Sequence, residues 1–211
     1  MNQLPYEFHV TVTPHERNPD EFREICAAIG VKAIVLDLGV NRGIELSDYM
    51  TSSTQMLHAD RDAAQELERI AREMKSAGLN VVRRKIETAP WHPQAPQVEG
   101  EAMPEGSYFE AHLGVLVGEE SVAVFRSDLQ DEDATKDLHL SRNAFKQASD
   151  GRVVMMATLR DYDSPYIDFA ERVARAQQSI EAMGLSLDKA PITEFALYDS
   201  NAHHDDAWMG V

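Results

Sequence analysis

The stretch Tyr6-Glu7-Phe8-His9-Val10-Thr11-Val12 alternates apolar and polar side chains near the start of the chain. Alternation with a period of two is typical of a β-strand, whose side chains point in turn to opposite faces of a sheet. A second stretch, Tyr108-Phe109-Glu110-Ala111-His112-Leu113-Gly114-Val115, carries the same Glu-x-His pair. The two pairs are 103 residues apart. Their recurrence predicts that one structural unit occurs twice in the chain.

Outward from these strands, the hydrophobic periodicity predicts the same order of elements in both halves. The stretch Asn18-Pro19-Asp20-Glu21 has the residues of a helix start, with an N-cap, a proline and acidic side chains. Gly30 and Gly78 follow helical stripes and fit C-terminal caps. The predicted strands cover residues 6–12, 32–38, 51–58, 81–87, 108–117, 137–141, 152–160 and 192–198. The predicted helices cover residues 18–29, 60–77, 119–129 and 164–183.

The order β-α-β-β-α-β is that of a ferredoxin-like unit, which carries its helices on one sheet face. We therefore expect an α+β protein of two tandem ferredoxin-like lobes, whose open sheet faces form a cleft between them. The expected boundaries are 1–88 for the first lobe, 89–106 for a proline-rich linker, 107–200 for the second lobe and 201–211 for a polar C-terminal tail. The linker contains Pro90, Pro93, Pro96 and Pro104, which block regular structure and favour a semi-rigid connector.

The composition excludes several classes of protein. The 211 residues include 20 Lys and Arg against 36 Asp and Glu, for a net charge of -16. Binding to a nucleic-acid backbone requires clustered Lys and Arg, so this charge argues against it. No apolar run reaches the roughly 18 residues of a membrane helix, and no membrane partner is expected. The single cysteine, Cys26, excludes an intrachain disulfide, and with no visible signal peptide it favours a cytoplasmic protein. The oligomeric state is not indicated.

Polar side chains share the predicted open faces. Glu7, His9 and Thr11 lie on one face of the first strand, and Glu110 and His112 lie on the matching face of the second. Because buried charges are costly unless they are paired or bound to a ligand, such a cleft indicates a functional site. Imidazoles titrate near neutrality and can act as acid and base. We therefore predict an enzyme for a small anionic substrate, with His9, His112, Glu7 and Glu110 as catalytic residues. The predicted substrate-binding residues are Thr11, Lys85, His139, Ser141, Arg142, Arg160, Glu194 and Tyr198.

The triplets His9-Val10-Thr11 and His139-Leu140-Ser141 resemble the paired His-x-Thr/Ser motifs of two-histidine phosphoesterases. The resemblance covers only these two triplets. It implies a bilobal hydrolase in which the two histidines act as acid and base and the hydroxyls hold the phosphate. Phosphoester hydrolysis is therefore the reaction that we expect.

A metal site is one alternative. Glu7, His9, Glu110 and His112 combine nitrogen and oxygen ligands that suit a divalent transition metal. This layout resembles that of the vicinal oxygen chelate family, whose ligands come from strands of paired lobes. A second candidate set is His203-His204-Asp205-Asp206 in the tail.

A protein without catalytic activity is the other alternative. The sequence contains no glycine-rich phosphate loop, P-loop or nucleophile elbow. The cleft would then bind a small ligand without turnover, or the lobes would be a scaffold for a partner protein. Repeated Glu-x-His pairs are also compatible with structural ion pairs on solvated sheet faces.

Overall fold

The fold is known from a computed structural model, which describes residues 3–13, 18–41, 44–147 and 150–205. The strands are β1 (Leu4–Val12), β2 (Lys32–Asn41), β3 (Ile44–Leu57), β4 (Val81–Thr88), β5 (Tyr108–Val117), β6 (His139–Gln147), β7 (Val153–Asp161), β8 (Ser186–Leu187) and β9 (Ile192–Asp199). The helices are α1 (Pro19–Ala28), α2 (Asp60–Ser76), α3 (Val122–Asp131) and α4 (Tyr166–Ala182), with short 3-10 helices η1 (Glu119–Ser121) and η2 (Ala202–Asp205).

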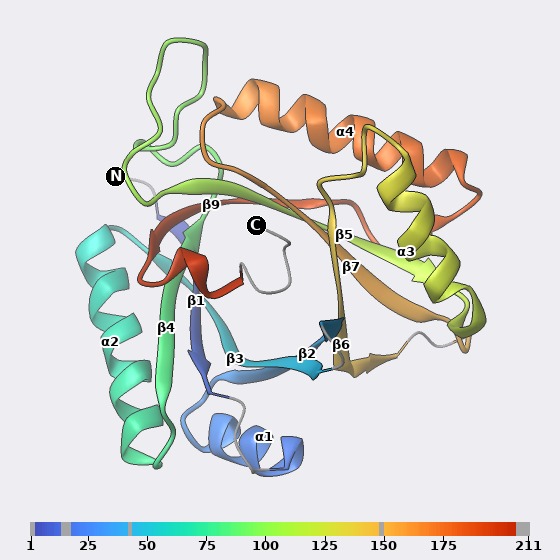
Figure 1. The fold of residues 1–211 in the computed structure, drawn as a ribbon. Helices are drawn as coiled ribbons and strands as arrows, with labels where there is room; N and C mark the ends of the chain where they lie inside the picture. The colour runs from blue at the N-terminus through green and yellow to red at the C-terminus, as the bar shows by residue number, and fades with distance from the viewer. Residues whose placement is uncertain (1–2, 14–17, 42–43, 148–149, 206–211) are drawn as a thin grey trace.

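The strands of the described residues form a closed antiparallel barrel. Their order in the sheet is β7-β6-β2-β3-β1-β4-β9-β5-β8, and β7 also pairs with β5. The pairing of β7 with β5 closes the first eight strands of this order into a barrel (Figure 1). The short β8 lies outside the closed ring and pairs with β5.

The expectation of two ferredoxin-like lobes with open sheet faces is wrong. Strands of the first half pair with strands of the second half at two places, β4 with β9 and β2 with β6. An isolated half would leave unpaired N–H and C=O groups at the edges of its sheet, and pairing with the other half satisfies them. The faces that we expected to be open therefore form the inner wall of one barrel.

The four helices lie outside the barrel, and the two hydrophobic cores lie between them and the barrel wall (Figure 1). One core joins Phe8 and Val10 of β1 to Leu67 and Ile70 of α2. The second core is built around Phe109, whose ring stacks on Phe169 of α4 and also contacts Phe195 of β9. Since the apolar side of each strand faces outward to a helix, the polar side faces the barrel interior.

The start of α1 has the predicted caps. The side chain of Asn18 accepts a hydrogen bond from the backbone N–H of Asp20, and Pro19 occupies the first turn. Gly30 and Gly78 follow α1 and α2 with φ values of 76° and 80°, a left-handed conformation that costs little only in glycine. The predicted beginning of α1 and the predicted ends of α1 and α2 are confirmed, whereas α2 begins after Ala59 without a side-chain cap.

The segment between β4 and β5 packs against both halves of the chain. His92 is buried, and its Nε2 lies 3.0 Å from Oδ1 of Asp60 at the start of α2. The same carboxylate accepts a hydrogen bond of 2.7 Å from the Tyr6 hydroxyl. The same segment also contacts α4, because the N–H of Tyr166 in α4 donates a hydrogen bond of 2.8 Å to the carbonyl oxygen of Pro96. These contacts fix the two helices relative to each other.

None of the helices in the described part of the chain is both long enough and apolar enough to span a membrane.

We expect Phe109→Ala to lower the free energy of unfolding by about 3–5 kcal/mol, because it removes a fully buried ring from the second core. Urea denaturation followed by circular dichroism measures this loss. Ile167→Ala on α4 is the control, since Ile167 is 53% exposed and its truncation should cost less than about 0.5 kcal/mol. Equal losses in the two variants would contradict this description of the core.

Candidate functional site

The barrel encloses a cavity of about 330 Å³. Side chains from all eight barrel strands line it, and so does Lys189, which lies between β8 and β9. Its volume falls within the range of sites for small molecules. The interior of the barrel is therefore the candidate site.

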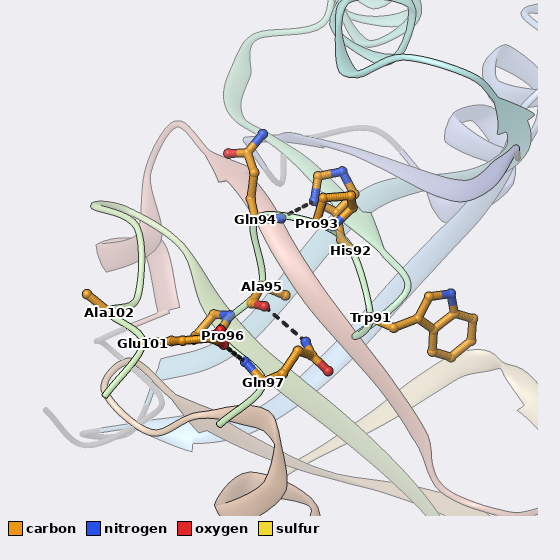
Figure 2. Close-up of a pocket in the computed structure, with 9 residues that line it drawn as sticks. All are labelled: Trp91, His92, Pro93, Gln94, Ala95, Pro96, Gln97, Glu101 and Ala102. Carbon is orange, nitrogen blue, oxygen red and sulfur yellow. Dashed lines mark hydrogen bonds between the residues drawn. The ribbon is translucent and has the colours of Figure 1, made fainter. Parts of the chain in front are cut away.

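A second hollow of similar volume lies on the segment between β4 and β5 (Figure 2). All of its lining residues lie within 91–102, so a single loop forms it. Figure 2 shows Gln97 bonded to Ala95 and Glu101 within this loop, in contacts of 3.0 and 2.6 Å that hold the loop together. Because these polar groups bond to one another and the hollow is open to solvent, we do not place the functional site there.

The cavity has two chemically different walls. The charged wall consists of Lys85 and Glu87 on β4, Glu194 on β9, and Glu110 and His112 on β5. The opposite wall, which we call the apolar wall, carries Ile34 and Leu36 on β2 and Met50 on β3, and the same two strands also contribute Lys32, Asp48 and Ser52 to the lining. In the strand order of the ring, β9 lies four strands from β2 in either direction. The two walls therefore face each other across the barrel.

Lys85 is the central ion of the charged wall. Its Nζ lies 2.7 Å from Oε1 of Glu87 and 2.7 Å from Oε1 of Glu110. The second oxygen of Glu110 accepts a hydrogen bond from Nε of Arg160. Lys85 and Arg160 both lie over the ring of Tyr108, 5.5 and 5.1 Å from its centroid. Glu87 and Glu110 thus each have a cation beside them, as buried charges require.

These contacts shift the pKa values of the network. Against the effect of burial, the charges of Arg160 and Lys85 hold the pKa of Glu110 well below its usual range. Lys85 and His9 lower the pKa of Glu87 to about 2. The two carboxylates raise the pKa of Lys85. All three groups are therefore charged at neutral pH.

Both histidines of the Glu-x-His pairs contact carboxylates. Nε2 of His9 lies 2.8 Å from Glu87, and its Nδ1 lies 2.9 Å from the carbonyl oxygen of Thr51. Because both ring nitrogens face acceptors, the protonated ring is favoured, and the pKa of His9 rises to about 9 despite burial. Nε2 of His112 lies 3.1 Å from Glu110, which raises its pKa as well.

The resemblance to two-histidine phosphoesterases is wrong, and so is the expected hydrolase. His9 lies on β1 and His139 on β6, and the strand order places β2 and β3 between them. Thr11 does not line the cavity, and its hydroxyl has no hydrogen-bond partner among the described residues. A histidine that is already protonated at neutral pH does not serve as a base. The resemblance to the vicinal oxygen chelate family depended on two paired lobes. The strands form one closed barrel instead, so this resemblance is wrong as well.

The structure brings most of the predicted site residues together. Besides the residues named above, Ser141 and Arg160 line the cavity. Arg142 instead pairs with Glu119 at 2.6 Å, on the side of β6 opposite to Ser141. His139 lies on β6 but does not line the cavity.

A β-bulge decides the position of Tyr198. The register of β4 against β9 shifts between Ile86, which pairs with Tyr198, and Glu87, which pairs with Ala196, so Leu197 is an extra residue. The bulge reverses the alternation, so that Tyr198 is 40% exposed and does not line the cavity. Asp199 turns inward instead and pairs with Arg83 at 2.5 Å.

Sequence reasoning missed Glu87 and Asp199. The inward position of Glu87 could have been predicted from the sequence, because Glu87 shares its face of β4 with Lys85, two residues earlier. The inward position of Asp199 depends on the bulge, for which the sequence carries no signal. Asp199 accepts a second bond, of 2.7 Å, from the hydroxyl of Tyr108, and its pKa falls to about 2 because of Arg83 and this bond.

Among the described residues, Glu87, Glu110 and His112 offer ligand atoms that lie within 4.8 Å of one another. The ammonium group of Lys85 contacts both of these carboxylates, so a divalent ion would have to displace it. We therefore assign the central positive charge to Lys85 and assign no metal ligands. In the tail, Nε2 of His204 lies 3.1 Å from Oδ1 of Asp48, while Asp206 and the side chains of His203 and Asp205 lie outside the described part of the structure.

Glu194 differs from the other carboxyl groups of the cavity. It is partly buried, and burial together with the charges of Glu87 and Glu7 raises its pKa to about 8. His112 and His9 oppose this shift without cancelling it. Glu194 is therefore mainly protonated and neutral at pH 7.

No protein-family model matches the sequence, and no curated protein matches it. A candidate chlorite dismutase of known structure has 9% identity and a TM-score of 0.26, over 97% of this chain and 98% of its own. A candidate monooxygenase from Fusobacterium nucleatum has 8% identity and a TM-score of 0.30, over 93% of each chain. The acetolactate synthase small subunit from Thermotoga maritima has 11% identity and a TM-score of 0.27, over 90% of this chain and 92% of its own. Similarities this low assign no activity to this chain.

We expect Lys85→Met to lower the free energy of unfolding by about 3–5 kcal/mol, because it leaves two buried carboxylates without their shared cation. Chemical denaturation at neutral pH measures the loss. Adding Glu87→Gln to this variant should restore part of the stability, since one uncompensated charge is then removed. No recovery in the double variant would show that the loss does not come from charge.

Stability should also fall as the pH rises from neutral to about 9.5. The folded protein keeps the proton of His9 up to a pKa of about 9, whereas the unfolded chain releases it near 6.5. The stabilisation by protonated His9 is complete below pH 6.5 and is lost as the pH passes 9. The loss is on the order of 3 kcal/mol from His9 alone, and Glu194 and His112 act in the same direction.

Denaturation at a series of pH values measures this slope. His9→Gln should lose less stability than the wild type over the same range, since the amide keeps a donor but does not titrate in it. Equal slopes in the two proteins would refute the assignment of the proton to His9.

Proposed function

We propose that the barrel interior binds a small molecule that combines an anionic group with an apolar body. The observation that supports this most directly is the pair of facing walls, one charged and one lined by Ile34, Leu36 and Met50. A ligand of this kind would place its apolar part against the β2–β3 side and its anionic group toward β4, β9 and β5. Pockets for small molecules commonly combine an apolar lining with a few convergent polar groups.

The charge of the cavity favours an anion. Five Lys and Arg side chains and five Asp and Glu side chains line it. At neutral pH, protonated His9 adds a positive charge, and neutral Glu194 removes a negative one. Even when Asp199 beside Arg83 is counted, the charges that line the cavity sum to a small positive value, to which the exposed Lys32 and Lys189 contribute, whereas the whole chain carries a charge of -16. An anion is therefore favoured in this region of an otherwise acidic protein.

A small-molecule ligand is favoured over the partner protein that the sequence left open. The polar groups converge inside a closed barrel, where a folded partner cannot reach them. An enzymatic reaction on the bound anion stays a prediction, as does the cytoplasmic location that the single cysteine favoured. The proposal requires neither phosphoester chemistry nor a metal ion, because Lys85 and Arg160 supply the positive charge.

Isothermal titration calorimetry with octanoate, octanesulfonate and octanol tests the proposal. The two anions should bind, and the neutral alcohol should bind more weakly, because all three have the same apolar chain and differ in charge. Met50→Trp should weaken anion binding by at least about tenfold, since a larger side chain fills the apolar wall.

Met56→Trp is the matched control. Met56 is on the same strand, is 52% exposed and does not line the cavity, so its replacement should leave binding unchanged. The proposal fails if neither anion binds, or if Met50→Trp and Met56→Trp bind equally well. Thermal denaturation of each variant verifies that it is folded.

A further inference from the structure

Glu194 is the one carboxyl group of the cavity that the structure leaves without a partner among the described residues. Glu7 accepts a bond of 2.7 Å from Ser52, and Asp48 lies 3.1 Å from His204. Glu87 and Glu110 both contact Lys85. Glu194 lines the same cavity but makes no such contact there. It is therefore available to a bound molecule, whereas the other carboxyl groups are already engaged.

The position of Glu194 follows from the sheet register. On β9 it pairs directly with Glu110 of β5, so the two side chains point to the same side of the barrel wall. Ile192, two residues before Glu194 and on the same face of β9, also lines the cavity. Glu194 thus lies within the charged wall, next to an apolar side chain.

Charged groups on the two strands beside β9 and on β1, the strand beyond β4, face Glu194. Strand β4 contributes Glu87, strand β1 contributes Glu7 and His9, and strand β5 contributes Glu110 and His112. Three carboxylates among these groups disfavour a further negative charge, and the adjacent cations of Lys85 and Arg160 are already paired with Glu110. The surroundings thus favour a neutral carboxyl, in agreement with its raised pKa.

We propose that Glu194 contacts the anionic group of the bound molecule and donates a hydrogen bond to it through its protonated carboxyl. The inference rests on the proposed function, because it needs a ligand in the cavity. A neutral carboxyl that donates to an anion forms a short, charge-assisted hydrogen bond. An ionised carboxylate in the same place repels the anion and has no proton to donate. The site therefore selects an anion and releases it when Glu194 ionises.

Titration of octanesulfonate into the protein at several pH values tests this inference, because a sulfonate stays charged throughout and only the protein titrates. We expect the affinity of the wild type to fall about tenfold as the pH rises from about 7 to about 9. Glu194→Gln keeps a neutral donor at every pH, so its affinity should hold through pH 8 and fall only where His9 loses its proton. Glu68→Gln is the control and should show the wild-type profile, since Glu68 is an exposed carboxylate on α2.

Two results would overturn the inference about Glu194 without overturning the proposed function. One is octanesulfonate binding with the same pH profile in the wild type and in Glu194→Gln. The other is an infrared spectrum at neutral pH in which Glu194→Gln loses no protonated-carboxyl band relative to the wild type. If octanesulfonate fails to bind the wild type at any pH, the proposed function itself is wrong. Binding with the expected difference between the two proteins supports both.

Discussion

The ion pairs of Lys85 hold together the interior on which the candidate site depends. Lys85 comes from β4 in the first half of the chain, and Glu110 comes from β5 in the second, with β9 between the two strands. The ammonium group contacts both Glu110 and Glu87, each of which is almost completely buried. Buried carboxylates are tolerated only where a cation compensates them. The pairing of charges thus joins the two halves inside the barrel, as the pairing of β4 with β9 joins them in the wall.

The barrel places its apolar packing on the outside and its polar groups on the inside. Phe8, Val10 and Phe109 point outward into cores that the helices cover, so the hydrophobic stabilisation comes from the layer between helices and strands. The interior is then free to hold charged side chains around a cavity of about 330 Å³. Because the cavity is enclosed by the barrel wall, the electrostatic interactions within it are stronger than they would be in water.

Packing of so many ionisable groups into one barrel changes the protonation states that the residue types suggest. His9 is held as a cation by Glu87 and by the carbonyl of Thr51, so it is not poised as a base at neutral pH. Glu194, surrounded by other carboxylates, is held neutral. Each shift reduces the energetic cost of the crowding, and together they make the charge of the cavity lining more positive. The proposed preference for an anionic ligand follows from these two shifts and not from any single residue.

The sequence by itself determined that β1 and β5 are strands and which face of each is polar. Alternation around Glu7, His9, Glu110 and His112 placed all four on one face, and the structure brings all four to the cavity, because a strand points alternate side chains to opposite sides whatever it packs against. The closure of the barrel was decided only by tertiary structure, since pairing of β2 with β6 and of β4 with β9 joins edges far apart in the chain. The bulge at Leu197, which turns Asp199 inward and Tyr198 outward, depends on the same pairing. The charge state of Glu194 depends on neighbours from β1, β4 and β5, which no local pattern on β9 specifies. Local alternation is a property of the backbone, whereas closure, bulges and pKa values depend on which strands meet.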